Sequence, residues 1–230
     1  MNECLLCKQE FIPEISFLQI FSWSKYREPK ICFRCLHQFE RLSEIRCKYC
    51  SKNMNVAGTC HDCLDWQQIY GQNLLYNYSV YRYNDYFHDL MVNYKRYGDY
   101  VLYEVLQEIC YKELLKIEAD LYVPIPTSPE HQQKRQFDTI SAIFSGLVPL
   151  TPLLKKKSGC EAQGEKNKYE RLASSQSFYI DKEKIKKSFN GKSILLLDDI
   201  YTTGRTLYHA RDQLLQFLPD SEIKSFSICR

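Results

Sequence analysis

The chain has 230 residues, of which 44% are hydrophobic and 26% charged, and its formal net charge is +3. This composition excludes a disordered chain, a collagen-like fibre and a coiled-coil rod, and the length predicts one domain with a small additional module. The longest apolar runs fall far short of the about 20 residues that a membrane helix needs, and the first residues lack the pattern of a signal peptide. We therefore expect a cytoplasmic protein without membrane insertion.

Four Cys-x-x-Cys pairs dominate the first 63 residues. They contain eight of the eleven cysteines, namely Cys4, Cys7, Cys32, Cys35, Cys47, Cys50, Cys60 and Cys63. Two such turns complete a tetrahedral zinc site, so four turns predict two zinc ions. The short spacing between the third and fourth turns favours sequential pairing, and a cross-braced pairing stays open. Disulfides and a thioredoxin-like redox motif are the alternatives, and His61 is an alternative ligand.

The predicted zinc sites are structural, because four sulfur ligands leave no position for water or substrate. A segment of this size buries too little apolar surface to fold unaided, and metal binding supplies the missing free energy. With two Zn²⁺ and eight thiolates, residues 1–70 have a net charge near −3. We therefore predict a zinc-ribbon-like module over residues 1–70, acting as a scaffold or docking module or binding DNA, and an α/β domain over residues 71–230.

The predicted domain begins with alternating aromatic and polar residues over 73–83, which indicate one or two strands. A helix then begins at Asn84 or Asp85 and stops at Gly98, and Asp99 opens a second helix. Strands and helices follow in the order strand 119–125, helix 135–147, strand 148–154, strand 194–198, helix 205–218 and strand 223–228. Such alternation predicts an α/β domain with a mostly parallel sheet.

Basic charge gathers in the middle of this domain. Residues 131–192 carry 13 basic and 6 acidic side chains, which indicates an anionic partner or a solvated lysine face. Residues 155–170 show no periodicity, and we expect a mobile loop there. The interleaved aromatic residues Phe137, Tyr169, Phe178 and Phe189 could stack on a single nucleic-acid strand, or they belong to the core.

The segment after residue 193 predicts a phosphate site. A buried strand ends in two carboxylates and is followed by a turn rich in hydroxyl groups that opens a helix, with the candidate residues Asp198, Asp199, Thr202, Thr203, Gly204, Arg205 and Thr206. Ligands bind at the carboxyl edge of parallel sheets, and a helix N-terminus suits a dianionic phosphate. The carboxylates could accept hydrogen bonds from sugar hydroxyls or support Mg²⁺. Phosphate with a diol describes a ribose 5-phosphate, and a helix cap without a ligand is the alternative.

This segment resembles the phosphoribosyl pyrophosphate (PRPP) motif of type I phosphoribosyltransferases, an apolar run followed by Asp-Asp-x-x-Thr-Thr-Gly-x-Thr. The whole chain is similar to the ComF family, in which a zinc module precedes a type I phosphoribosyltransferase-like domain. Residues 123–128 resemble the family's Val-Pro-x-Pro turn, which implies that Thr127 and Ser128 contact the pyrophosphate.

Further motifs carry the same resemblance with some departures. Residues 95–99 resemble the family's Lys-Tyr-x-Gly-Asp, and residues 135–138 resemble its Arg-Gly-Phe-Asn, with Gln136 and Asp138 in place of glycine and asparagine. Residues 155–171 stand where these enzymes carry a flexible catalytic loop, and Gln163 and Arg171 are the matching positions, although the asparagine expected shortly after them is missing. No residue specifies a nucleobase.

The resemblance implies a PRPP-binding competence protein that is needed for uptake and handling of transforming single-stranded DNA. It implies Mg²⁺ with the PRPP, and as partners the ComFA helicase-like ATPase, DprA and single-stranded DNA. The alternative is an active phosphoribosyltransferase acting on an unidentified acceptor. Asp198 and Asp199 would then hold the ribose as positive charge develops at its anomeric carbon, and a loop lysine or arginine would close over the diphosphate.

Overall fold

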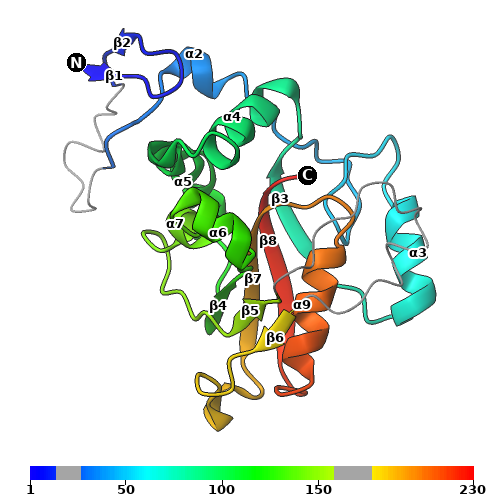
Figure 1. The fold of residues 1–230 in the computed structure, drawn as a ribbon. Helices are drawn as coiled ribbons and strands as arrows, with labels where there is room; N and C mark the ends of the chain where they lie inside the picture. The colour runs from blue at the N-terminus through cyan, green and yellow to red at the C-terminus, as the bar shows by residue number, and fades with distance from the viewer. Residues whose placement is uncertain (14–26, 158–177) are drawn as a thin grey trace, which may run out of the picture.

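A four-stranded sheet forms the centre of the protein (Figure 1). The computed structural model describes residues 1–13, 27–157 and 178–230. In spatial order the strands are β3 (Asn77–Tyr81), β8 (Glu222–Cys229), β7 (Ser193–Ile200) and β4 (Leu121–Pro124). Every neighbouring pair is parallel. The predicted α/β class with a parallel sheet is therefore confirmed.

Strand β7 is apolar on both sides because helices cover both faces of the sheet. Leu195 and Leu197 pack into one core, and Ile194 and Leu196 pack into the other. Side chains of a strand point alternately to the two faces, so a strand buried on both faces has a continuous apolar sequence. The apolar run ends where the carboxyl edge of the sheet begins.

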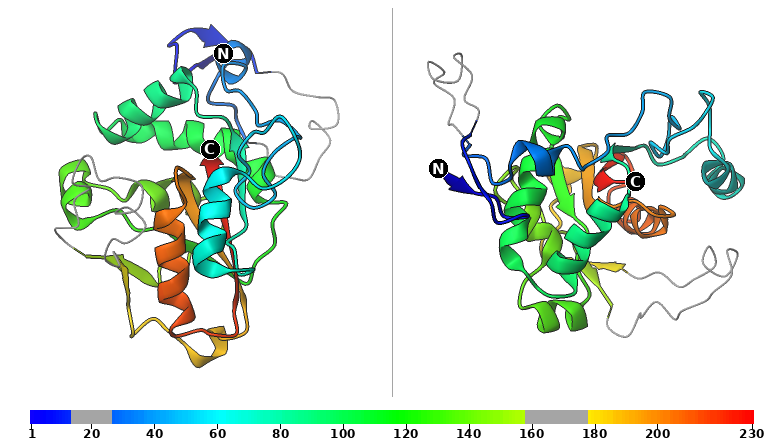
Figure 2. Two further views of the ribbon diagram at one scale, coloured as in Figure 1. Left: turned by 90° about the vertical axis from the view of Figure 1, so that its right-hand side faces the viewer. Right: turned by 90° about the horizontal axis from the view of Figure 1, so that it is seen from above.

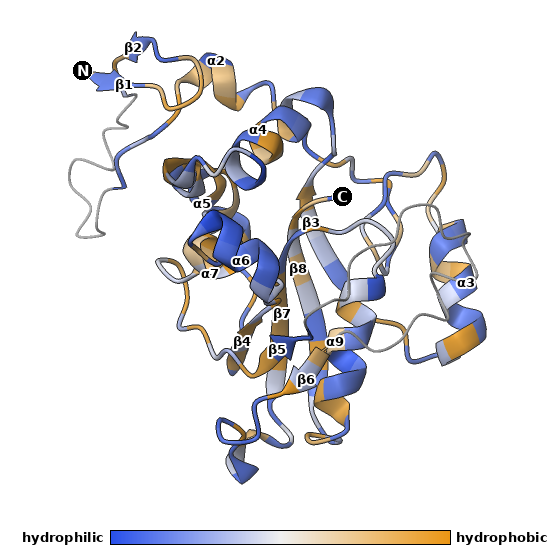
Figure 3. Ribbon diagram, viewed as in Figure 1, coloured by the Kyte–Doolittle hydropathy of each residue, from blue (hydrophilic) through white to orange (hydrophobic). Residues whose placement is uncertain are grey.

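Helices from different parts of the chain cover the two faces (Figure 2). One face carries α4 (Asp85–Lys95), the 3-10 turn η1 (Tyr100–Leu102), α5 (Tyr103–Leu114) and α7 (Thr139–Phe144). The other face carries α3 (His61–Tyr70) and α9 (Arg205–Leu215). Apolar residues gather on the inner sides of these helices and along the strands, and polar residues lie outside (Figure 3). Among the described residues, no helix has both the length and the apolar character to cross a membrane.

Helix α4 begins where the sequence predicts, whereas the next helix does not begin at Asp99 as predicted. Asn84 caps α4, since its side chain accepts a hydrogen bond from the Phe87 N–H at 2.9 Å. Asp99, by contrast, makes no capping hydrogen bond, and the chain passes through the 3-10 turn η1 before α5 begins.

The helix predicted over residues 135–147 is present as α7, but its predicted bounds were wrong, since it covers only Thr139–Phe144. A separate helix, α6 (Pro129–Arg135), precedes it, and Gln136 between the two has the left-handed conformation with φ 67°. A left-handed residue ends a helix, because it turns the chain away from the helical path. This break places α6 at the carboxyl edge of the sheet, beside the end of β7 (Figure 1).

The prediction of a strand over residues 148–154 was also wrong. Strand β5 (Leu154–Lys156) begins at the last of these residues and pairs antiparallel with β6 (Phe178–Ile180). Pro149 and Pro152 have no N–H to donate to a ladder, so the preceding segment makes only an isolated bridge between Leu150 and Tyr122. The rest of the predicted loop, with Gln163, Tyr169 and Arg171, lies outside the described residues.

The cysteine-rich segment contains β1 (Asn2–Glu3), β2 (Glu10–Phe11) and α2 (Phe33–Leu36), and it packs against both faces of the domain. Cys4 and Cys35 belong to the core under α4 and α5, whereas Cys47 and Cys60 belong to the core under α9. The predicted boundary at residue 70 stays a prediction.

Candidate functional site

A cavity of about 600 Å³ opens at the carboxyl edge of the sheet, where β4 and β7 end. Its lining consists of Tyr83, Lys95, Ile125, Pro126, Thr127, Ser128, His131, Arg135, Thr139, Ile140, Lys156, Asp198, Asp199, Ile200, Tyr201, Thr202 and Thr206. Two segments face each other across it. We call residues 198–206 the turn wall, and Lys95 with residues 127–139 the helix wall.

The two carboxylates of the turn wall differ in their surroundings. Asp199 is 3% exposed, and its Oδ2 lies 2.5 Å from the Nζ of Lys95 at the end of α4. Asp198 is half-buried, and burial together with the neighbouring charge of Asp199 raises its pKa to about 7. Lys95 and Lys156 act in the opposite direction. One carboxylate is thus paired with a cation, and the other changes its charge near neutral pH.

The turn itself is compact. Gly204 has φ 82° and immediately precedes α9, and a Cβ atom there would overlap the Tyr201 hydroxyl. Glycine is required for two reasons: other residues rarely adopt this backbone conformation, and the Tyr201 ring leaves no room for a side chain at this position. The first N–H groups of α9 have no partner within the helix, and Thr202 and Thr206 line the cavity beside them. This end of the turn wall can therefore donate several hydrogen bonds to an anion.

Hydrogen bonds from Asp138 hold the helix wall. Its Oδ1 accepts from the Ser141 N–H at 2.8 Å and caps α7, and its Oδ2 accepts from the Thr127 N–H at 3.0 Å. An asparagine has only one side-chain oxygen, so the aspartate found here, in place of the family's asparagine, serves both donors. Arg135 donates from Nε to the Lys95 carbonyl at 2.7 Å and so joins α6 to the end of α4.

The departure at Gln136 has a structural consequence. This residue occupies a left-handed position, where the family pattern has the glycine that such a position favours. The chain therefore places a residue with a side chain in a conformation that costs about 1–2 kcal/mol in residues other than glycine.

The structure brings together most of the expected binding residues. Asp198, Asp199, Thr202, Thr206, Thr127 and Ser128 all line the cavity. The other three belong to the turn without lining it: the Thr203 carbonyl accepts a hydrogen bond from Trp66, Gly204 precedes α9 and Arg205 begins it.

Several lining residues were not singled out as site residues from the sequence. Lys95 was noted only within a family-like motif, and nothing local indicated that its ammonium group reaches Asp199. Tyr83 and His131 lie in segments that the chain path alone brings to the cavity, whereas Lys156 is one of the loop lysines from which one was expected to close over the diphosphate.

The basic residues of the stretch 131–192 lie in different parts of the structure. Lys156 lines the cavity, whereas Lys182, Lys184, Lys186, Lys187 and Lys192 are exposed before the start of β7, at the opposite edge of the sheet. Of the two alternatives for the interleaved aromatic residues, Phe178 belongs to the core, because it is 1% exposed. Phe137 and Phe189 pack against the two cores.

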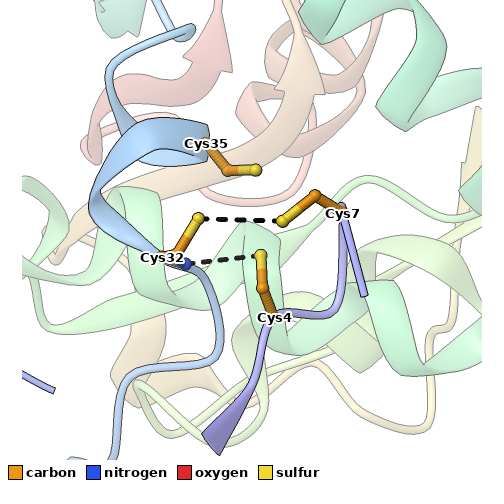
Figure 4. Close-up of side chains that lie close together, drawn as sticks. All are labelled: Cys4, Cys7, Cys32 and Cys35. Atoms are coloured by element: carbon orange, nitrogen blue, oxygen red, sulfur yellow. Dashed lines mark hydrogen bonds between the residues drawn. The ribbon is translucent and has the colours of Figure 1, made fainter. Parts of the chain in front are cut away.

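The cysteines form two groups of four. The first group is Cys4, Cys7, Cys32 and Cys35, whose sulfur atoms point toward one another (Figure 4). The second is Cys47, Cys50, Cys60 and Cys63. The structure therefore shows the sequential grouping, and His61 belongs to neither group and lies 3.4 Å from Asp65.

Both groups fit a tetrahedral zinc ion. All four sulfur atoms in each lie within 4.8 Å of one another. Zn–S bonds of about 2.3 Å imply sulfur–sulfur distances of about 3.8 Å in a tetrahedron. The Cys7–Cys32 pair is at 3.8 Å and the Cys50–Cys60 pair at 3.4 Å. A backbone N–H donates to a sulfur in each group, from Cys32 to Cys4 and from Cys60 to Cys47, both at 3.3 Å. The groups differ in burial, since Cys7 is exposed and all four cysteines of the second are buried.

Fold and site together define an α/β domain with a parallel sheet and a cavity at its carboxyl edge, joined to a cysteine-rich segment that could bind two zinc ions. The chain is 30% identical to competence protein ComFC of Streptococcus pneumoniae (strain ATCC BAA-255 / R6), over 99% of this chain and 100% of that protein. It is 29% identical to competence protein ComFC of Bacillus subtilis (strain 168), over 99% of this chain and 94% of that protein. The chain belongs to the ComFC family of competence proteins.

No protein-family model matches the chain. A similar solved structure is the allosteric regulatory enzyme of purine biosynthesis, with 13% identity and a TM-score of 0.31 over 54% of this chain and 26% of that one. A TM-score this low supports no argument about the fold or the site.

Proposed function

We propose that the protein binds PRPP in the cavity and acts as a phosphoribosyltransferase-like competence protein in the uptake and handling of transforming single-stranded DNA. The observation that supports PRPP binding best is the position of Asp198 and Asp199 next to Thr202 and Thr206 in one cavity. Carboxylates accept hydrogen bonds from the ribose hydroxyls, while threonine hydroxyls and a helix N-terminus donate to the 5-phosphate.

The helix wall suits the pyrophosphate. Thr127 and Ser128 bring a hydroxyl-bearing turn to the cavity, and Lys95, Arg135 and Lys156 bring positive charge. Cations offset the charge of a diphosphate in a partly buried site. Mg²⁺ is the expected companion of PRPP, because oxygen ligands from carboxylates and phosphates suit it. Asp198 is the carboxylate available for that role, since Asp199 already pairs with Lys95.

Zinc in both cysteine groups is part of the proposal, in a structural role. The donor sets support it, being four thiol groups each with no open position. The cysteine-rich segment also presents a surface for the protein partners ComFA and DprA, and the exposed Phe33 of α2, at 64%, supports docking there.

Direct contact with single-stranded DNA is supported by the exposed lysines over residues 182–192. Phosphate contacts of this kind depend on salt concentration, because each one releases counterions. Fluorescence anisotropy with a labelled oligonucleotide tests this. We expect a Lys184→Gln/Lys187→Gln variant to bind more weakly and with a smaller salt slope, and an unchanged slope would exclude these lysines as the contact.

Calorimetric titration of PRPP with Mg²⁺ into the full chain tests the ligand site. We expect micromolar binding that falls at least tenfold in an Asp198→Asn/Asp199→Asn variant and stays within twofold in an Asp181→Asn variant outside the cavity. No binding by the wild type would refute the proposal. Faster pyrophosphate release with the protein than without it, with water taking the ribosyl group in place of the unidentified acceptor, would support the alternative, an active phosphoribosyltransferase.

A further inference from the structure

One side chain connects the second cysteine group to the turn wall. Arg230 has a side-chain exposure of 8%, and its Nη2 lies 3.3 Å from the Sγ of Cys50 and 3.2 Å from the Oδ2 of Asp62. Its Nη1 donates to the carbonyls of Tyr201, at 3.3 Å, and of Thr202. A single guanidinium group thus bonds a cysteine sulfur on one side and the turn on the other.

A second contact runs in parallel from the same cysteine group. Cys60 precedes α3, Cys63 lies in its first turn, and Trp66 lies one turn further along. The Nε1 of Trp66 donates to the Thr203 carbonyl at 2.8 Å. Trp66 is buried and stacks on Tyr208 of α9 with ring centroids 4.1 Å apart, so its direction is fixed.

These contacts take three successive carbonyl groups, those of Tyr201, Thr202 and Thr203. In a trans peptide the C=O group and the following N–H group point in opposite directions. Holding the three carbonyls toward the cysteine group therefore directs the N–H groups of Thr202, Thr203 and Gly204 away from it. Those N–H groups are donors of the expected phosphate site.

Packing strengthens this arrangement. The Arg230 guanidinium lies over the Tyr201 ring, 4.7 Å from its centroid, and Gly204 lies against the hydroxyl end of the same ring. The order from cysteine sulfur to glycine is thus Cys50, Arg230, Tyr201 and Gly204. Groups that hold a metal ligand by a second hydrogen bond typically change metal affinity when they are lost.

We propose that Arg230 and Trp66 are positioning residues that aim the phosphate donors of the turn, so that binding of a dianionic phosphate at the turn and of a metal ion at the second cysteine group are coupled. The coupling is reciprocal, since each ligand stabilises the same arrangement of Arg230. The ligand part rests on the proposed binding of PRPP and zinc, whereas the positioning of the turn can be tested without either ligand being added.

The test compares Arg230→Met with Arg211→Met in the full chain. Arg211 is the control, because its side chain is also 8% exposed and it bonds the Asn73 carbonyl at 2.7 Å. It also lies over the Tyr208 ring on which Trp66 stacks, so its loss measures the effect of packing with both hydrogen bonds to the turn kept. The readouts are the ¹⁵N relaxation order parameters of the backbone N–H groups of residues 202–206 without PRPP, the rate at which zinc passes to a chelator, and calorimetric affinity for PRPP with Mg²⁺.

We expect Arg230→Met to lower the order parameters of the turn from about 0.85 to below about 0.6. We also expect it to accelerate zinc release from one of two sites about tenfold and to weaken PRPP binding about tenfold. Arg211→Met should leave the order parameters unchanged and change the other two quantities by less than twofold, whatever its melting temperature. Equal effects of the two variants, or unchanged order parameters in Arg230→Met, would overturn the inference. If the wild type does not bind PRPP, the proposed function fails and the order parameters still decide the positioning role.

Should Arg230→Met not fold, Trp66→Phe gives the second measurement. It removes the N–H donor to Thr203 and keeps an aromatic ring beside Tyr208. We expect a lower order parameter for the N–H of Gly204, which follows this carbonyl, and an unchanged value there would count against the inference.

Discussion

The two walls of the cavity are held in place by different parts of the molecule. The turn wall is tied through Arg230 and Trp66 to the buried second cysteine group, far away in the sequence. The helix wall is held chiefly by the hydrogen bonds of Asp138 to Thr127 and Ser141, and by bonds from Arg135 and to Thr139 that join it to the end of α4. The contacts of the turn wall span 137 and 180 positions, whereas those within the helix wall span at most 45, and the Lys95–Asp199 ion pair joins the two walls. Substitutions in the second cysteine group should therefore disturb the turn wall more than the helix wall.

The largest effect is expected from the second cysteine group. Cys50→Ser removes a buried ligand inside the core that also contains Leu196 and Tyr208, so we expect a loss of about 5 kcal/mol and a melting temperature lower by about 10–20 °C. Cys7→Ser affects an exposed position and should shift the main transition by only about 2–4 °C. Calorimetry with zinc analysis measures both. Equal losses would show that the two groups support the domain alike.

The next largest effect is expected at Gly204. Gly204→Ala places a methyl group against the Tyr201 hydroxyl and forces a left-handed alanine, which together cost about 3 kcal/mol. Gly191→Ala is the control, because Gly191 has φ 77° with nothing within 4 Å of a Cβ, and it should cost about 1–2 kcal/mol. Urea denaturation gives both values. A decrease in the free energy of unfolding no greater for Gly204→Ala than for Gly191→Ala would mean that the Tyr201 side chain moves away at little cost.

The raised pKa of Asp198, about 7, predicts a pH dependence within the turn wall. The folded protein keeps a proton that the unfolded chain releases from its ordinary pKa of 3.8, so this group makes the protein less stable as the pH rises from about 4 to 7. Asp198→Asn removes that trend. We expect the stability difference between variant and wild type to change by up to about 1.4 kcal/mol per pH unit in this range.

Denaturation at pH 5, 6, 7 and 8 without added magnesium measures this difference. Charges on Asp199, Lys95 and Lys156 face the same carboxyl, and they are present in both proteins. A difference that stays constant across the four pH values would contradict the raised pKa of Asp198.

The smallest effect is expected in the helix wall. Gln136→Gly relieves a left-handed residue and loses the exposed hydrogen bond from the Gln136 side chain to the Gln133 carbonyl, and it should stabilise the protein by about 0.5–1 kcal/mol, with no change in the order parameters of the turn wall. Gln133→Gly, inside α6, should instead destabilise by about 0.5–1 kcal/mol. Stability is measured by urea denaturation. A destabilising Gln136→Gly would show that the glutamine makes a compensating contact.

Much of the fold could be predicted because its signals are local. The apolar run of β7, the cap at Asn84 and the glycine of the turn each lie within a few residues of the structure they determine. The errors arose where one residue broke a pattern. The left-handed Gln136 separates α6 from α7, so α7 begins later than predicted. Pro149 and Pro152 lack N–H donors, so the strand begins only at Leu154.

The sequence by itself determined the chemistry of this protein: four Cys-x-x-Cys turns for metal, and a pair of carboxylates before a hydroxyl-rich turn for a phosphorylated sugar. Only the tertiary structure decided which groups meet. The Lys95–Asp199 ion pair joins residues 104 positions apart, and Arg230 reaches Cys50 across 180 positions. Contacts of this kind are set by how sheet and helices pack, because no local pattern encodes which distant side chain a fold will bring alongside.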